Sequence, residues 1–296
     1  MYSHTIQLQQ LKLHYLDSEK DSLKNTNSEN ETIIFLHGFP QYSGAWEAQL
    51  RFFQPYYRVV APDLPGYNLS DKPDDVDFFS VQNLIAVMAE FISKINNNDS
   101  VYLVAHDWGG AIAWPLVAFY PQLVKKLIIL NAAHPSTFTR EILHNPVQQQ
   151  KSAYISDLIA EDAPEQMRKN HFAYLKTLMS QDIGRLPISD KQMDAHLTTW
   201  RQPKAIESML NYYRKMPLHE NKERNDAKIP NIRIERPTLI LWGLEDSAFC
   251  PELLEGIEEY VPNLIIEKFA GASHWLHHEI ADRVNASIKA FLIDMS

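Results

Sequence analysis

The stretch VYLVAHDWGG, Val101 to Gly110, passes from a short apolar run through a carboxylate to two glycines. The run VYLVA has the length and composition of a buried β-strand, and the glycines permit a sharp turn into the helix that the next residues predict. Asp107 stands where the strand passes into the helix. An aspartate there can be a helix N-cap, a buried structural partner or the reacting group of an enzyme, and the rest of the chain bears on that choice.

Apolar runs and helical patterns alternate on both sides of this stretch. Short apolar strands separated by helices indicate a parallel sheet covered on both faces, so the predicted fold class is α/β. The predicted strands are TIIFLHG, YRVVAPDLPG, SVYLVAHD, KKLIILNAA, RPTLILWGLED and LIIEKFAGASHW. The predicted helices are SVQNLIAVMAEFISKI, GGAIAWPLVAFYP, ELLEGIEEYV and EIADRVNASIKAFLIDM. The polar stretch from Asp17 to Thr32 is predicted as a solvated turn between strands.

The alternation of strands and helices is interrupted at residues 134–232. They contain helical patterns such as AYISDLIAED and AIESMLNYYRKM, hold no apolar strand, and end in the charged segment HENKERNDAK. Ligands of an α/β sheet bind beyond the carboxyl ends of its strands, so an insertion that leaves from such an end would cover the site. We therefore predict a core of residues 1–133 and 233–296 and an all-helical cap of residues 134–232.

The composition narrows the possible partners. Hydrophobic residues make up 45% and charged residues 22% of the 296 residues, as in a globular protein with a sizeable core. The formal charge of −9 argues against nucleic acid and anionic membranes, which select basic surfaces. With Cys250 alone, neither an internal disulfide nor a thiolate zinc site can form, and no metal or other cofactor is expected. The sequence has neither a signal-peptide pattern nor a membrane span, so we expect a cytoplasmic protein, either a monomer or a homodimer.

Asp107 has two partners of the right kind farther along the chain. Small Ala105 and Gly109 flank it in the small-x-nucleophile-x-Gly pattern of the α/β-hydrolase elbow, in which Ser is the usual nucleophile. Asp246 follows the predicted strand LILWG, and His274 follows the last predicted strand, in the chain order nucleophile, acid, histidine. A carboxylate nucleophile forms an ester, so a base is needed to activate the water that cleaves it. We predict surface positions for the nearby His277 and His278.

Glycines and backbone amides complete the predicted site. Six of the nine glycines lie at strand ends, which indicates a crowded place where several strands converge: Gly38, Gly66, Gly109, Gly110, Gly243 and Gly271. The backbone N–H groups of Phe39 and Trp108 are the predicted oxyanion donors, one in the turn HGFP and one at the start of the helix. His37, Pro40, His106 and Trp275 adjoin these positions, and we predict that they line the substrate pocket.

HGFP, APDLPGYNLSDKP, AHDWGGAIAW, LWGLED and SHWLHHE together closely resemble the epoxide hydrolases of the α/β-hydrolase superfamily. The resemblance covers essentially the whole chain. It implies that Asp107 opens a small hydrophobic epoxide to a hydroxyalkyl ester. His274, supported by Asp246, would then activate water to release a vicinal diol. It further implies two cap tyrosines that hydrogen-bond the epoxide oxygen, for which NYYRKMP selects Tyr213 and NPVQQQKSAYISDL selects Tyr154.

Two alternatives stay open. Haloalkane dehalogenases use the same aspartate nucleophile, although they commonly carry Asn where this chain has Phe39. Fluoroacetate dehalogenases carry arginines just after the nucleophile that hold the substrate carboxylate, and this chain has no arginine there. A non-catalytic, ligand-binding hydrolase fold is less compatible with a full set of reacting groups. The chain departs from the family pattern at Ala105, Asn68, Ser273 and Pro115. Pro115 lies inside the helix after the nucleophile, where it should cost stability or bend the helix.

Overall fold

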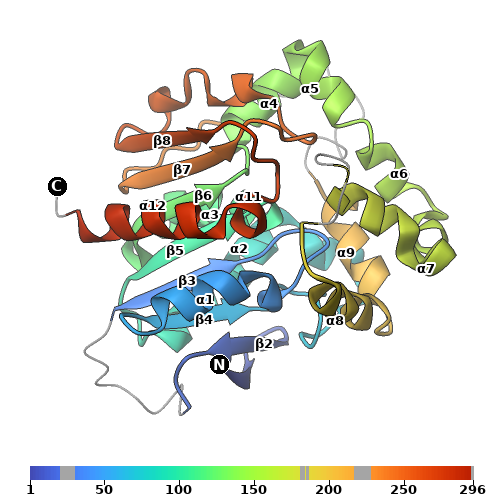
Figure 1. The fold of residues 1–296 in the computed structure, drawn as a ribbon, viewed down its shortest axis with the longest axis horizontal. Helices are drawn as coiled ribbons and strands as arrows, with labels where there is room; N and C mark the ends of the chain where they lie inside the picture. Colours follow the sequence, from blue (N-terminus) through green and yellow to red (C-terminus); the bar gives the residue numbers. More distant parts are fainter. Residues whose placement is uncertain (21–30, 181–183, 185–186, 217–227, 295–296) are drawn as a thin grey trace.

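An eight-stranded sheet forms the centre of the molecule (Figure 1). The structure is a computed structural model, and it describes residues 1–20, 31–180, 184, 187–216 and 228–294. The strand order is β1-β2-β4-β3-β5-β6-β7-β8. The β1–β2 and β2–β4 pairs are antiparallel, and the other pairs among the described strands are parallel. The strands are β1 (Tyr2–Gln7), β2 (Lys12–Asp17), β3 (Thr32–Leu36), β4 (Arg58–Pro62), β5 (Val101–His106), β6 (Val124–Leu130), β7 (Thr238–Gly243) and β8 (Leu264–Phe269).

Helices cover both faces of this sheet, as the α/β prediction requires. In Figure 1, α1 (Glu47–Phe53) and α12 (Ala281–Ile293) lie in front of the sheet, and α2 (Val81–Ile95) and α3 (Trp108–Phe119) lie behind it. β3, β4, β5 and β7 are buried along their whole length because they are covered on both sides. The predicted α/β class is therefore confirmed. Helix α3 continues through Pro115 without a break.

One predicted helix needs correction, and one observed helix was not predicted. The segment ELLEGIEEYV is not one helix but two 3-10 turns, Pro251–Leu254 and Ile257–Glu259. Gly256 separates them with φ of +69°, a left-handed conformation that ends any helix at that point. Helix α1 was not predicted, because its seven residues are too few for a helical pattern to stand out. The last helix, α12, lies where it was predicted.

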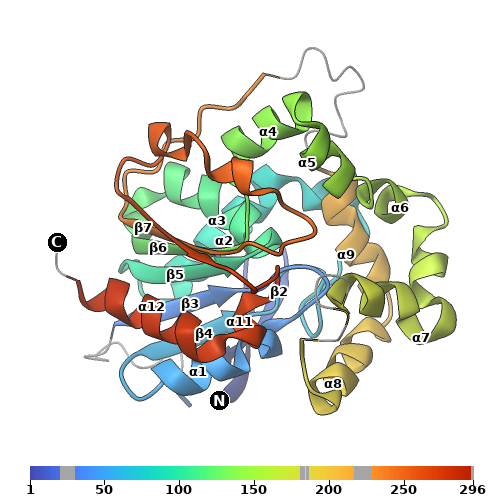
Figure 2. The same ribbon diagram turned by 45° about the horizontal axis from the view of Figure 1, so that its top comes forward.

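The remaining helices lie together beside the sheet (Figure 2). They are α4 (Pro135–His144), α5 (Pro146–Lys151), α6 (Ile155–Ile159), α7 (Ala163–Ser180), α8 (Asp190–Trp200) and α9 (Ala205–Arg214). The backbone of α7 leaves helical geometry between Lys169 and Phe172. Tyr213 of α9 packs against Phe39 and Trp108, which follow β3 and β5, so α9 lies over the carboxyl ends of these strands. Most of the charged segment HENKERNDAK and of the polar stretch after Asp17 lies outside the described residues.

No helix within the described part of the chain is both long enough and apolar enough to cross a membrane. A four-residue helix, α11 (Leu276–Glu279), joins the β8 loop to α12. The division of the chain into core and cap at residues 134 and 232 stays a prediction.

Candidate active site

Asp107 occupies a strained turn between β5 and α3. Its φ of 51° and ψ of −121° lie in a region that non-glycine residues rarely adopt, and its side chain makes no capping hydrogen bond to α3. A Cβ atom on Gly38 would lie 2.3 Å from Asp107 Cβ, and one on Gly109 would lie 2.4 Å from the carbonyl oxygen of Leu36. The glycines are therefore needed for close approach, and the turn directs the carboxylate away from the helix.

The carboxylate of Asp107 accepts a hydrogen bond from the backbone of the β3 turn. Phe39 N donates to Asp107 Oδ1 at 2.6 Å, which brings the predicted Phe39 amide to the predicted nucleophile. The backbone N–H of Trp108 also interacts with this carboxylate and contributes to its low pKa. Both amides predicted as oxyanion donors thus meet at Asp107.

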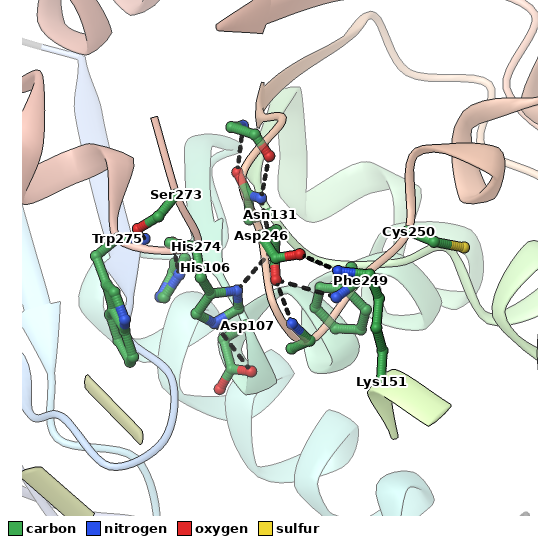
Figure 3. A network of polar contacts seen from close by, with 12 residues as sticks. His106, Asp107, Asn131, Lys151, Asp246, Phe249, Cys250, Ser273, His274 and Trp275 are labelled. Carbon is green, nitrogen blue, oxygen red and sulfur yellow. Dashed lines mark hydrogen bonds and ion pairs between the residues drawn. The ribbon is translucent and has the colours of Figure 1, made fainter. Parts of the chain in front are cut away.

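His274 lies between two carboxylates (Figure 3). Its Nδ1 is 2.8 Å from Asp246 Oδ2, and its Nε2 is 3.6 Å from Asp107 Oδ2. The three residues come from the ends of β5, β7 and β8, which are brought to one edge of the sheet by parallel pairing. In this arrangement, Nδ1 of His274 faces Asp246, and Nε2 faces the carboxylate of Asp107.

Asp246 is held by several donors that fix its orientation. It is 2% exposed, and its Oδ1 accepts hydrogen bonds from the backbone N–H groups of Ala248 at 2.7 Å and Phe249 at 3.0 Å. Asn131 Nδ2 donates to Asp246 Oδ2 at 2.6 Å (Figure 3). Asn131 is not among the site residues that the sequence predicts. Its contact with Asp246 crosses 115 positions along the chain, and the sequence carries no local signal for it.

The charges of Asp107 and His274 stabilise each other. Burial, the largest influence, would raise the pKa of Asp107, but the hydrogen bond and charge of His274 outweigh it and lower that pKa below its ordinary value. Burial likewise opposes protonation of His274, but the charges of Asp246 and Asp107 and their hydrogen bonds raise the histidine pKa well above its ordinary value. Asp107 is therefore ionised, and His274 is its positively charged partner.

Two neighbouring cavities open onto Asp107. The larger one has a volume of about 440 Å³ and is lined mainly by apolar side chains of α2, α3, α4 and the segments around Tyr154 and Tyr213. The smaller one has a volume of about 30 Å³ and is bordered by Asp107, His274 and both tyrosines. Asp107 and the two tyrosines thus lie at the junction of an apolar cavity and a small chamber.

The two tyrosines predicted from the cap lie side by side. The ring centroids of Tyr154 and Tyr213 are 6.3 Å apart, and Tyr213 packs edge-on against Phe39 at 5.1 Å and Trp108 at 5.2 Å. Burial, together with the negative charge of Asp107, raises the pKa of Tyr154 and holds that of Tyr213 well above 10. Both phenols are therefore protonated and can donate hydrogen bonds into the cavity.

The four residues predicted to line the pocket fall into two groups. Pro40 and Trp275 border the small chamber, whereas His37 and His106 border neither cavity. His37 accepts from Leu64 N and donates to Gly38 O, both at 3.0 Å, and His106 Nε2 donates to the carbonyl oxygen of His274 at 2.9 Å. Burial lowers the pKa of His37 and lowers that of His106 to about 3, so both side chains are neutral. Their hydrogen bonds hold the backbone around the site in place.

The surface prediction for the histidines after His274 was wrong for His277, which is fully buried. Its Nε2 is 3.2 Å from Gln41 Oε1, and its ring centroid lies 4.4 Å from that of His106. The prediction treated α11 as continuing a surface helix, but α11 packs inward as a single turn. His278 is partly buried, and Gln41 Nε2 donates to its Nε2 at 2.7 Å. Within the described residues, no three His, Cys, Asp or Glu side chains are placed to hold a metal ion.

Comparisons with known proteins identify the family of this chain. Residues 31–280 match the model of the alpha/beta hydrolase fold, and the chain belongs to that family. Epoxide hydrolase 4 of Mus musculus is 35% identical over 271 residues, which are 88% of this chain and 72% of the relative. Epoxide hydrolase 1 of Caenorhabditis elegans is 32% identical over 297 residues, which are 98% of this chain and 70% of the relative.

A solved structure extends this likeness to the whole fold. It is a mutant of an epoxide hydrolase from Bacillus megaterium, complexed with its product, a naphthyloxy-propane-1,2-diol. It is 32% identical to this chain and has a TM-score of 0.89, with 98% of this chain and 100% of the other covered. These three relatives are epoxide hydrolases, the class that the sequence resembles.

Proposed function

We propose that this protein hydrolyses epoxides to vicinal diols through a covalent ester on Asp107. The proposal rests on the groups that surround the carboxylate of Asp107. His274 Nε2 lies 3.6 Å from Oδ2, and Phe39 N lies 2.6 Å from Oδ1. The phenols of Tyr154 and Tyr213 line the same cavity. The epoxide hydrolases among the relatives support the same reaction class.

In the first step, an oxygen of Asp107 attacks an epoxide carbon and breaks the carbon–oxygen bond of the ring. The hydrogen bond from Phe39 N to Oδ1 and the charge of His274 keep the carboxylate ionised and oriented. The departing oxygen needs a proton, because a free alkoxide is a poor leaving group. Tyr154 and Tyr213, which line the same cavity as Asp107, supply hydrogen bonds or that proton.

In the second step, water attacks the carbonyl carbon of the ester. The chamber of about 30 Å³ beside His274 and Asp107 is large enough for one water molecule. Once Asp107 is esterified and has lost its charge, His274 releases its proton to solvent. Neutral His274 Nε2 then takes a proton from the attacking water, while Asp246 Oδ2, at 2.8 Å from Nδ1, stabilises the imidazolium that forms. The amides of Phe39 and Trp108 stabilise the oxyanion that forms on the former carboxylate. When this intermediate collapses, the bond between the carboxyl carbon and the substrate oxygen breaks, the diol oxygen takes the proton from His274, and Asp107 returns as a carboxylate.

The division of labour between core and cap follows from this scheme. The core, residues 1–133 and 233–296, supplies Asp107, His274 and Asp246. The cap, residues 134–232, supplies Tyr154 and Tyr213 and covers the apolar cavity. Since that cavity is mainly apolar, the substrate is a hydrophobic epoxide; the naphthyloxy diol bound to the bacterial relative makes aryl glycidyl ethers suitable first probes.

A substrate screen with two variants tests the proposal. The purified protein should convert aryl glycidyl ethers and styrene-oxide-like epoxides to diols, and Asp107→Ala should abolish this activity. Tyr213→Phe should lower the kcat of epoxide opening by about 10²-fold, since it removes one proton donor. Halide release from haloalkanes needs no donor at that position. Halide release without diol formation would identify a dehalogenase, and tight binding without turnover would identify a ligand-binding protein.

A further inference from the structure

Pro115 leaves one backbone carbonyl in α3 without its helical donor. A residue in an α-helix donates its N–H to the carbonyl four positions earlier, and proline has no N–H. Within α3, the carbonyl oxygen of Ala111 therefore lacks the donor that residue 115 would supply, whereas the N–H of Tyr120 at the end of the helix donates to the carbonyl of Leu116. The ring of Pro115 also pushes this carbonyl away from the helix axis.

The freed carbonyl lies on the face of α3 that borders the large cavity. Trp108, Ala111, Pro115 and Phe119 all line that cavity, and their spacing of three or four residues defines one face of the helix. Between Trp108 and Val117, Ala111 is the one residue that is partly exposed, and the others are buried. The gap between Ala111 and Pro115 therefore faces the cavity.

We propose that the Ala111 carbonyl is a substrate-binding acceptor that selects epoxides carrying a hydroxyl or N–H donor at a fixed distance from the ring. This inference rests on the proposed function. Ala111 lies four residues after Asp107, so the acceptor is about 6 Å farther along the axis of α3 than the reacting carboxylate. A saturated chain of about five bonds spans that distance. An acceptor in an apolar cavity favours a substrate that satisfies it over one that leaves it unpaired.

The test compares ω-hydroxy-1,2-epoxyalkanes of about five to nine carbons with their ω-methyl ethers, which keep the oxygen and lose the donor. In the unchanged protein, kcat/KM for the alcohol should exceed that for the ether by about three- to tenfold at one or two adjacent chain lengths. Pro115→Ala and Pro115→Val restore an N–H for Ala111, so both should remove this preference. Both variants should also melt at a higher temperature, because the helix regains a hydrogen bond.

Two variants of different side-chain volume separate hydrogen bonding from packing. Equal loss of the preference in Pro115→Ala and Pro115→Val supports the acceptor. Alcohol-to-ether ratios that follow the volume of residue 115, that vary smoothly with chain length, or that persist in both variants overturn it. If neither alcohols nor ethers are hydrolysed by the unchanged protein while haloalkanes are, the proposed function itself fails, and the two failures are thus distinguished.

Discussion

At the scale of single residues, the site works through charges that depend on each other. Asp107 keeps its charge because His274 is protonated beside it, and His274 keeps its proton because Asp246 and Asp107 are ionised. Formation of the ester removes the charge of Asp107 but leaves Asp246 in place. His274 then loses one of the interactions that raise its pKa, so it becomes neutral more readily, and the neutral form is the one that can accept a proton from water.

This coupling predicts different pH profiles for the two steps. Ring opening needs ionised Asp107 and protonated tyrosines, so its rate should be flat from below pH 5 to above pH 9, since the Asp107 pKa is lowered from 3.8 and those of the tyrosines are raised above 10. Ester hydrolysis needs neutral His274, so its rate should rise with pH through the histidine pKa of the ester. Stopped-flow measurement of both steps, with NMR titration of His274 in the free protein, checks this.

The contrary results are equally specific. An inflection of ring opening near neutral pH would mean that Asp107 is not held ionised. Hydrolysis that inflects at or above the pH at which His274 titrates in the free protein would mean that Asp107 does not raise the pKa of His274. Either result would remove the electrostatic basis of the two-step scheme.

The residues of the site were predictable to different degrees. Asp107, Asp246 and His274 were found because each follows an apolar run, and the carboxyl ends of parallel strands meet at one sheet edge. His106 was misplaced because successive side chains in a strand point to opposite faces, so the neighbour of a cavity residue faces away from the cavity. Asn131 was missed because its contact with Asp246 depends on tertiary packing.

At the scale of elements, glycine contacts decide how closely the strand ends approach each other. A Cβ atom on Gly243 would lie 2.2 Å from the carbonyl oxygen of Ser273 and 2.6 Å from that of Ala272. These carbonyls belong to the loop that carries His274. The β7 strand end therefore sets the position of the histidine as well as that of Asp246.

Gly243→Ala should accordingly lower the free energy of unfolding by about 1–3 kcal/mol and slow ester hydrolysis, because the displaced loop misplaces His274. Gly271→Ala is the matched control. Its Cβ would meet no atom within 4 Å, so it suffers only the strain of a φ of +76°. Denaturant unfolding and the decay of the ester measure both effects. Equal ester decay in the two variants would contradict the role assigned to the close contact.

At the scale of the whole molecule, a buried ion pair ties the N-terminal hairpin to the sheet. Arg58 of β4 lies 2.7 Å from Asp17 of β2, and Arg58 also donates to the carbonyl oxygen of Ile95 at the end of α2 at 3.0 Å. Both side chains of the pair are almost fully buried. The sequence predicted the sheet and its covering helices from their apolar patterns, but not this pair, whose partners are 41 positions apart.

Arg58→Met should lower the free energy of unfolding by about 3–5 kcal/mol, because it leaves Asp17 buried and without its cation. The double variant Asp17→Asn, Arg58→Met should recover part of that loss. Both should keep the kcat/KM of the unchanged protein at temperatures where they are folded, since neither residue borders a cavity with Asp107. Urea unfolding curves and epoxide assays check these expectations. A double variant no more stable than Arg58→Met would show that the unpaired charge is not the cause.

The covalent ester on Asp107 is the central claim, and a single turnover in heavy-oxygen water tests it most directly. With the protein in excess over an aryl glycidyl ether, the diol released should carry no label, and the peptide that contains Asp107 should gain one heavy oxygen. Water attacks the ester carbonyl in this scheme, so the new oxygen stays on the aspartate. Label in the diol after that first turnover, with none in Asp107, would mean that water attacks the epoxide itself and would contradict the account.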